Sequence, residues 1–189
     1  MVWTFEALLV EICAPTLMGV KAASLFRYSV IDGEDVFDEV DHFNHKLQSF
    51  GIRIVILKKC CKSDSYLIYV YRKKLLVPIL QDEDVKAFLL RNGYDGEDSV
   101  EGMLQTLSER LCLQEDFPHE IGIFLGYPLD DVIGFIENEG RNCTCCGYWK
   151  VYGNPVHAKK KFNVYDTCTS YCKKLFAHGI SVPQLAVAI

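Results

Sequence analysis

Two runs of β-branched and aromatic residues restrict the possible folds of this chain more than any other feature. The run IRIVIL begins at Ile52, the run YLIYVYR begins at Tyr66, and the polar stretch KKCCKSDS separates them. Such residues pack well on a pleated surface, and two runs joined by a short polar segment are typical of a β-hairpin. We therefore expect these strands at the centre of a sheet, with YWKVYG from Tyr148 as a possible third strand.

The N-terminal part of the chain shows the apolar spacing of amphipathic helices. Residues 5–12 predict a first helix that ends near Pro15, because the residue before a proline avoids helical geometry. Residues 17–25 predict a second short helix. Residues 36–50 predict a third helix that ends at Gly51.

Helical spacing returns after the hairpin. Residues 73–112 predict helices separated by turns at 81–84 and 92–96, where Gly, Asn and Asp interrupt the apolar period. Residues 119–138 predict two short helices joined at Gly126. A cap and first-turn pair, Asn154 followed by Pro155, predicts a long last helix to about Ala177.

Strands without regular helical crossovers favour an α+β fold, here a small antiparallel sheet covered by several helices. Half of the 189 residues are hydrophobic, which is enough for a packed core. A chain of this length suits one domain, and we expect residues 1–189 to form it.

Composition and charge exclude several classes of function. The first residues lack the basic start and apolar run of a signal peptide, and no apolar run is long enough to span a membrane. We therefore expect a cytoplasmic protein whose nine cysteines are reduced. A net charge of −5 disfavours DNA as a partner, because DNA binding depends on clustered Lys and Arg.

Cysteines give the densest chemical signal. Cys143, Cys145 and Cys146 are followed by Cys168 and Cys172, which lie one helical turn apart. Thiolates bind zinc, copper(I) and iron, but this spacing matches neither a zinc-ribbon nor a ferredoxin pattern. The alternative is that these cysteines are small buried hydrophobic residues.

Three further groups carry weaker signals. Cys60 and Cys61 lie among lysines that would favour the thiolate, although a loop with incidental thiols explains them equally well. His42 and His45 are three residues apart on a predicted helix, where they could hold a metal or simply face solvent.

His119 and Glu120 open a predicted helix without the second histidine that a zinc-protease helix requires. They could perform general acid and base chemistry, or serve only at the helix terminus. The segment 119–138 superficially resembles a helix-turn-helix, but its second helix carries acids where a DNA-reading helix carries basic or amide side chains.

Three long segments resemble an uncharacterised bacterial family that is catalogued as a domain of unknown function. The segments are CAPTLMGVKAASLF, HEIGIFLGYPLDDVIGFIENEG and CCGYWKVYG. The resemblance spans nearly the whole chain, and it implies no established activity, cofactor or fold. Within the motifs fall Cys13, Pro15, Thr16, Leu17, Gly19, Lys21, His119, Glu120, Gly126, Tyr127, Asn138, Cys145, Gly147, Trp149, Lys150, Tyr152, Gly153 and Cys168.

The resemblance narrows the thiol set to Cys13, Cys145 and Cys168, because the other cysteines fit the family pattern less well. It also suggests a redox or iron-metabolism protein as partner, by association of the family with flavodoxin and ferrous-iron transport proteins.

Three functions are compatible with the sequence. The first is a thiol-dependent redox or iron-handling protein with a metal bound by Cys13, Cys145 and Cys168. The second is a non-catalytic protein-binding or adaptor domain. The third is a small-molecule enzyme that uses His119, Glu120 and Lys21 or Lys150, which requires these groups to line one pocket.

Overall fold

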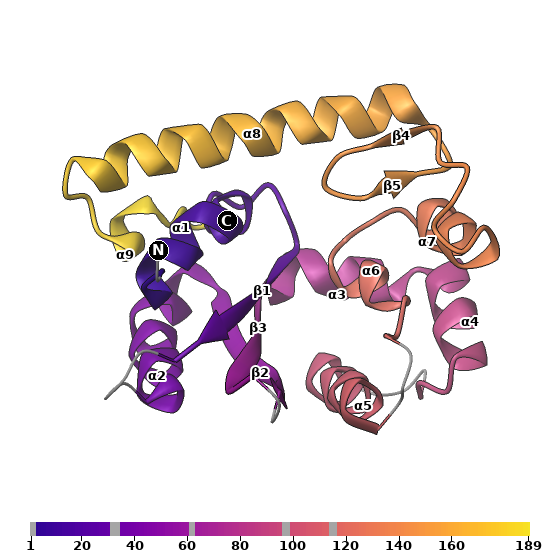
Figure 1. The fold of residues 1–189 in the computed structure, drawn as a ribbon, viewed down its shortest axis with the longest axis horizontal. Coiled ribbons are helices and arrows are strands. Elements are labelled where there is room, and N and C mark those ends of the chain that lie inside the picture. The colour runs from indigo at the N-terminus through magenta and orange to yellow at the C-terminus, as the bar shows by residue number, and fades with distance from the viewer. Residues whose placement is uncertain (1–2, 31–34, 61–62, 96–98, 114–116) are drawn as a thin grey trace.

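The computed structural model describes residues 3–30, 35–60, 63–95, 99–113 and 117–189. Within these residues a three-stranded antiparallel sheet lies between two groups of helices, and one long helix runs along the edge of the molecule (Figure 1). The α+β fold expected from the sequence is confirmed.

The predicted hairpin is present and forms two of the three strands. β2 (Ile52–Cys60) and β3 (Ser65–Arg72) pair in antiparallel fashion, and β1 (Ala23–Ser29) pairs with the other side of β3. β3 is therefore the central strand and β2 an edge strand. Both faces of β3 are covered, which explains its nearly continuous apolar sequence.

The expected short helix over residues 17–25 is wrong. α1 (Phe5–Leu17) ends before Gly19, which has a φ of +75° that a residue with a side chain rarely adopts. The chain then turns into β1, whose side chains Phe26 and Tyr28 enter the core that α1 covers. Strand pairing with β3 outweighed the weak helical spacing of this segment.

α1 also continues through Pro15, where the sequence predicted its end. Pro15 lies in the last turn, where it supplies no N–H for the hydrogen bond to the carbonyl four residues earlier. Residues Cys13 to Leu17 are all buried, and α1 packs on β1 and on α8 (Pro155–Ala177). Burial of this turn outweighs the local preference of the residue before proline.

Two apolar cores lie on the two faces of the sheet. α1, α2 (Val36–Leu47) and α9 (Val182–Leu185) cover one face, and the helices between residues 73 and 137 cover the other. The latter are α3 (Lys73–Gln81), α4 (Glu83–Arg91), α5 (Val100–Leu113), α6 (Ile121–Phe124) and α7 (Leu129–Glu137). A short 3₁₀ helix, η1 (Gln48–Phe50), follows α2 and ends at Gly51, as predicted.

Arg72 at the end of β3 ties together three segments that are distant in sequence. Its fully buried guanidinium donates hydrogen bonds to the carbonyl oxygens of Thr16, Leu17, Phe50 and Val187, over 2.5–2.7 Å. The end of α1, η1 and the C-terminal segment therefore meet at one cation.

The segment YWKVYG is not the third strand of the main sheet. It contributes β5 (Lys150–Val151), which pairs only with β4 (Cys145–Cys146) in a separate two-stranded sheet. This hairpin lies between α7 and the N-terminal end of α8 (Figure 1). α8 has the predicted bounds, with Asn154 as its N-cap and Gly179, at a φ of +86°, beyond its end.

In the part of the chain that the structure describes, no helix is both long enough and apolar enough to cross a membrane.

Candidate functional site

Asp131 fixes the β4–β5 hairpin on α7. Its Oδ2 accepts a hydrogen bond from Trp149 Nε1, and its Oδ1 accepts bonds from the backbone N–H groups of Tyr152 and Gly153, all over 2.7 Å. The side chain is only 4% exposed, so these three donors replace the water that a carboxylate otherwise binds. Asp131 thus holds Trp149 in one orientation.

Close packing at Gly134 completes this attachment. A Cβ atom at this position of α7 would lie 2.5 Å from the side chain of Tyr152. Only glycine allows the hairpin to approach the helix so closely.

Aromatic rings fill the space around Trp149. Its indole stacks on the ring of Tyr127 at 4.8 Å and meets the edge of Phe162 from α8 at 4.6 Å. Tyr127 belongs to the turn between α6 and α7, and its hydroxyl donates to the carbonyl oxygen of Tyr148. The rings thereby join three elements.

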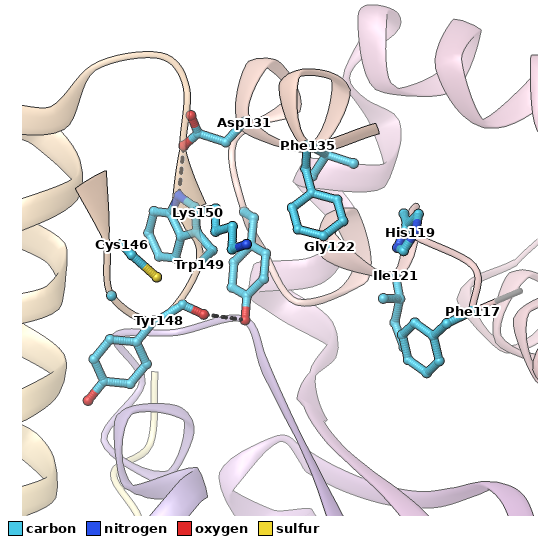
Figure 2. A pocket seen from close by; sticks show the side chains of 13 residues that line it. Phe117, His119, Ile121, Gly122, Asp131, Phe135, Cys146, Tyr148, Trp149 and Lys150 are labelled. Carbon is cyan, nitrogen blue, oxygen red and sulfur yellow. Dashed lines mark hydrogen bonds between the residues drawn. The ribbon is translucent and has the colours of Figure 1, made fainter. Parts of the chain in front are cut away.

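A cavity of about 440 Å³ opens beside these rings. Figure 2 shows Cys146, Tyr148 and Trp149 on one side of it, Phe117, His119 and Ile121 on the other, and Phe135 between them. Its lining consists of Phe117, His119, Ile121, Gly122, Tyr127, Asp131, Val132, Phe135, Cys146, Gly147, Tyr148, Trp149 and Lys150. We call it the aromatic cavity.

Two side chains of the lining can act on a polar ligand group. Lys150 Nζ donates to the Gly140 carbonyl oxygen at 2.6 Å and lies 5.8 Å from the centre of the Phe135 ring. An ammonium has three donors, so two remain for a ligand. The His119 ring lies 4.9 Å from Phe135 on the other side of the cavity and is exposed.

Glu120 does not face the aromatic cavity with His119. Its buried carboxylate accepts hydrogen bonds from Arg110 Nε at 2.6 Å and from the Tyr94 hydroxyl at 3.1 Å. The side chains of His119 and Glu120, expected from the sequence as an acid and base pair, therefore lie apart. His119 lines the aromatic cavity, and Glu120 is buried against Arg110 and Tyr94.

Lys21 lines a different cavity, of about 380 Å³, together with Glu11, Ile12, Ser24, Leu25, Leu125, Tyr127 and Tyr148. We call it the lysine cavity.

The Nζ atom of Lys21 donates to the Ala23 carbonyl oxygen at 2.5 Å and lies 5.6 Å from the centre of the Tyr127 ring. Burial lowers the pKa of Lys21 from its ordinary value of 10.5 to about 8. Of the four residues proposed for enzyme chemistry, His119 and Lys150 therefore share one cavity, while Lys21 and Glu120 do not join them.

The three thiols favoured by the family resemblance lie in different surroundings. Cys13 is buried in α1, and desolvation raises the pKa of its thiol to about 12. Cys168 is buried in α8, where desolvation also raises its pKa, and Cys145 lies half-buried in β4. Among the described residues no group of three or more His, Cys, Asp or Glu side chains is placed to hold a metal ion. Cys13 packs in the core under α1, and Cys145 packs against the cluster around Trp149.

Two of the weaker candidates, His42 and His45, are exposed on α2. Among the described residues they belong to no group of three or more potential metal ligands. Cys60 is half-buried at the end of β2, and Cys61 lies outside the described residues.

Sequence reasoning missed the parts played by Asp131 and Phe135. Asp131 and its exposed neighbour Asp130 both lie in the first turn of α7, where any acidic side chain interacts favourably with the helix dipole, so residue type alone does not distinguish them. The density of aromatic residues around Trp149 was the available signal, because buried rings with polar neighbours often line ligand cavities.

Comparison with known proteins gives one match. The model of a protein family described as "Protein of unknown function (DUF3793)" matches residues 9–186. No curated protein and no solved structure matches the chain.

Proposed function

The chain belongs to the DUF3793 family, and we propose that it is a binding protein for a small planar molecule that carries an anionic group. The observation that carries this proposal is the aromatic cavity with Lys150 at its wall. The family has no established function from which a ligand could be transferred.

The apolar part of the ligand is argued from the walls. Five aromatic side chains line the cavity: Phe117, Tyr127, Phe135, Tyr148 and Trp149. Ring faces attract other planar groups, and cavities of a few hundred Å³ with apolar walls and a few polar groups are typical of small-molecule sites. The hydrogen bond from Trp149 to Asp131 holds the indole in place without a ligand, which lowers the entropy cost of binding.

The anionic part is argued from the charges that face the cavity. Lys150 retains two free donors, and His119 adds a ring nitrogen on the opposite wall. The carboxylate of Asp131 does not oppose an anion strongly, because three hydrogen bonds to it are already formed. Glu120 binds Arg110 and Tyr94, and Asp131, the carboxylate in the lining, is occupied by its three donors, so the arrangement supports binding of a ligand by Lys150 and His119.

The test uses Trp149 as reporter. The chain has two tryptophans, so a Trp3→Phe background leaves Trp149 as the only indole. In this background we expect 8-anilinonaphthalene-1-sulfonate to quench Trp149 saturably by energy transfer. Replacing Lys150 with Met should weaken this binding about tenfold or more, since a hydrogen bond to a charged group is worth roughly 1.5–3 kcal/mol.

Two controls make the result specific. N-phenyl-1-naphthylamine is the same probe without its sulfonate, and Lys150→Met should leave its affinity unchanged. Lys160→Met removes an exposed charge of α8 outside the cavity lining and should affect neither probe. Equal losses for both probes in Lys150→Met, or a loss in Lys160→Met, would contradict the proposal, as would the absence of saturable quenching.

The other functions expected from the sequence stay predictions. No contact in the described structure supports thiol-dependent redox chemistry, iron handling, a redox partner or an adaptor surface. A cytoplasmic location is also proposed, and the eight cysteines that the structure describes are all free, as reduced thiols would be.

A further inference from the structure

The ammonium of Lys21 is buried beside a cavity, and it forms no ion pair among the described residues. Lys21 is 7% exposed and lines the lysine cavity, which lies between the α1–β1 region and the turn after α6. Burying a charge is costly unless it is paired and hydrogen-bonded. Its one hydrogen bond, to the Ala23 carbonyl oxygen, occupies one of three donors.

The surrounding groups do not supply the missing charge. No ion pair of Lys21 is formed within the described residues. Glu11 lines the same cavity, but its carboxylate binds Lys173 at 2.7 Å. The thiol of Cys13, whose pKa burial raises to about 12, stays protonated at neutral pH. The hydroxyls of Tyr127 and Tyr148 are neutral there too, because burial raises the pKa of both.

The other residues that line the lysine cavity indicate the shape of a ligand that fits it. Ile12, Leu25 and Leu125 give the cavity apolar walls, and the ring of Tyr127 closes it beside Lys21. Ser24 also lines the cavity, with its hydroxyl 2.9 Å from that of Thr16. A hydroxyl rotates to suit its partners, so Ser24 can donate to a ligand while it accepts from Thr16.

We propose that the lysine cavity binds a small organic acid, with the carboxylate paired to the Lys21 ammonium and a compact apolar body against Ile12, Leu25 and Leu125. One ammonium and one hydroxyl match the charge and donor needs of a carboxylate. A phosphate dianion would require more cationic donors, and Glu11 at the same cavity opposes it. The lysine cavity shares Tyr127 and Tyr148 with the aromatic cavity, but it has its own cation, Lys21, which does not line the aromatic cavity. The proposal therefore does not depend on the function of the aromatic cavity.

The experiment measures binding at Lys21 itself. Protein labelled with ¹³C at the lysine ε-carbon is titrated with benzoate, hexanoate and their neutral amides, benzamide and hexanamide. The Lys21 signal is assigned by its loss in Lys21→Met. We expect saturable shifts with the acids, at least tenfold weaker binding of the amides, and a rise in the Lys21 pKa when an acid is bound, because the carboxylate stabilises the ammonium.

Variants separate this site from the aromatic cavity. Calorimetry should show that Lys21→Met and Lys21→Gln lose acid binding at least tenfold while thermal unfolding shows both variants folded. Lys150→Met should bind the acids as the unaltered protein does. The same variant tests the aromatic cavity with 8-anilinonaphthalene-1-sulfonate, so each proposal can fail alone.

Several results would overturn the assignment. The acids could leave the Lys21 signal unchanged, the amides could bind as tightly as the acids, or folded Lys21 variants could retain acid binding. Loss of acid binding in Lys150→Met would move the site to the aromatic cavity. Tighter binding of inorganic phosphate than of either acid would exclude an organic acid as the preferred ligand class.

Discussion

Arg72 and Lys21 are both buried cations that have no carboxylate partner among the described residues, and the comparison between them separates a structural charge from a binding charge. Arg72 is completely buried and donates to four carbonyl oxygens from three segments. Lys21 is nearly as buried but donates to one carbonyl oxygen and lines a cavity. Burial alone therefore does not distinguish the two roles.

The difference follows from the chemistry of the two groups. A guanidinium is planar, remains charged and directs its donors in a fixed fork, so a ring of carbonyl oxygens can satisfy most of it. An ammonium is a compact, strongly hydrated charge whose pKa falls when it is buried. The structure accordingly gives four of the five Arg72 N–H donors an acceptor, whereas among the described residues Lys21 has one acceptor for three donors. Burial lowers the pKa of both groups, but an arginine stays charged at neutral pH. Unused donors beside a cavity are what identify a binding charge.

The largest expected effect is the loss of the Arg72 contacts. Arg72→Met removes the guanidinium donor from four carbonyl oxygens, of which those of Thr16 and Leu17 keep backbone donors. A hydrogen bond to a charged group is worth roughly 1.5–3 kcal/mol, so we expect a loss of about 3–5 kcal/mol. Urea unfolding should show that much destabilisation. Arg27→Met, which removes an exposed arginine from β1, should change the free energy of unfolding by less than about 0.5 kcal/mol. If Arg72→Met lost as little stability as Arg27→Met, the hydrogen bonds of Arg72 would not stabilise the fold, and Arg72 would not be a structural charge.

The buried carboxylate of Asp131, like the buried guanidinium of Arg72, should stabilise the fold through its hydrogen bonds. In Asp131→Asn the amide oxygen can still accept from Tyr152 and Gly153, but the amide nitrogen faces the Trp149 N–H donor. One unsatisfied buried donor costs about 1–3 kcal/mol, and the freed indole should weaken binding of 8-anilinonaphthalene-1-sulfonate. Asp130→Asn is the matched control, because it removes the same charge from the same helix turn at an exposed position. Equal unfolding energies for the two variants would show that only the helix dipole matters here.

The smallest expected effect concerns Lys21 and depends on pH. The unfolded chain keeps the Lys21 proton up to about pH 10.5, whereas the folded chain loses it near pH 8. Between these values the unfolded chain binds more protons, so the contribution of Lys21 to stability rises with pH. At pH 7 Lys21→Met should therefore be more stable than the unaltered protein, by about 1–2 kcal/mol after allowing for the lost hydrogen bond.

The pH series gives this prediction its check. The gap between the two proteins should shrink as the pH rises from 8 toward 10.5, measured by urea unfolding at each pH. The Cys13 thiol acts in the opposite direction, because the pKa of about 12 in the folded state means that stability falls above pH 9. The two groups interact, since the Lys21 ammonium lowers the pKa of the Cys13 thiol, so the effect of Lys21 is read between pH 7 and 9, where the thiol keeps its proton. A constant gap, or a less stable variant at pH 7, would show that the folded protein accommodates this ammonium without cost.

Local patterns in the sequence predicted most helices and the hairpin. The caps at Asn154 and Gly179 and the apolar period before Gly51 are signals within a few residues of the boundaries that they set. The failures were at β1 and at YWKVYG. β1 pairs with β3, which is distant in the chain, whereas YWKVYG pairs with its neighbour β4 and not with the main sheet. The spacing of residues contains no information on which of these partners a strand takes.

The residues of the candidate sites could also be predicted only in part. The sequence identified His119, Lys150 and Lys21 as residues capable of binding or catalysis because their side-chain chemistry is evident without coordinates. It also grouped Glu120 with His119 because the two are adjacent. In a short helical turn adjacent side chains point in different directions, and Glu120 was taken up by Arg110 and Tyr94.

The sequence by itself determined the α+β class, the hairpin, the bounds of α8 and the resemblance to a family, because each depends on residue types at short spacing or on matched motifs. Only the tertiary structure decided that the thiols lie apart, that Asp131 holds Trp149, and that Lys150 and Lys21 face different cavities. These properties depend on how segments from α1, α7, α8 and the β4–β5 hairpin pack together. The sequence gives the chemical type of each side chain. Which side chains become neighbours depends on how the whole chain packs when its apolar residues are buried.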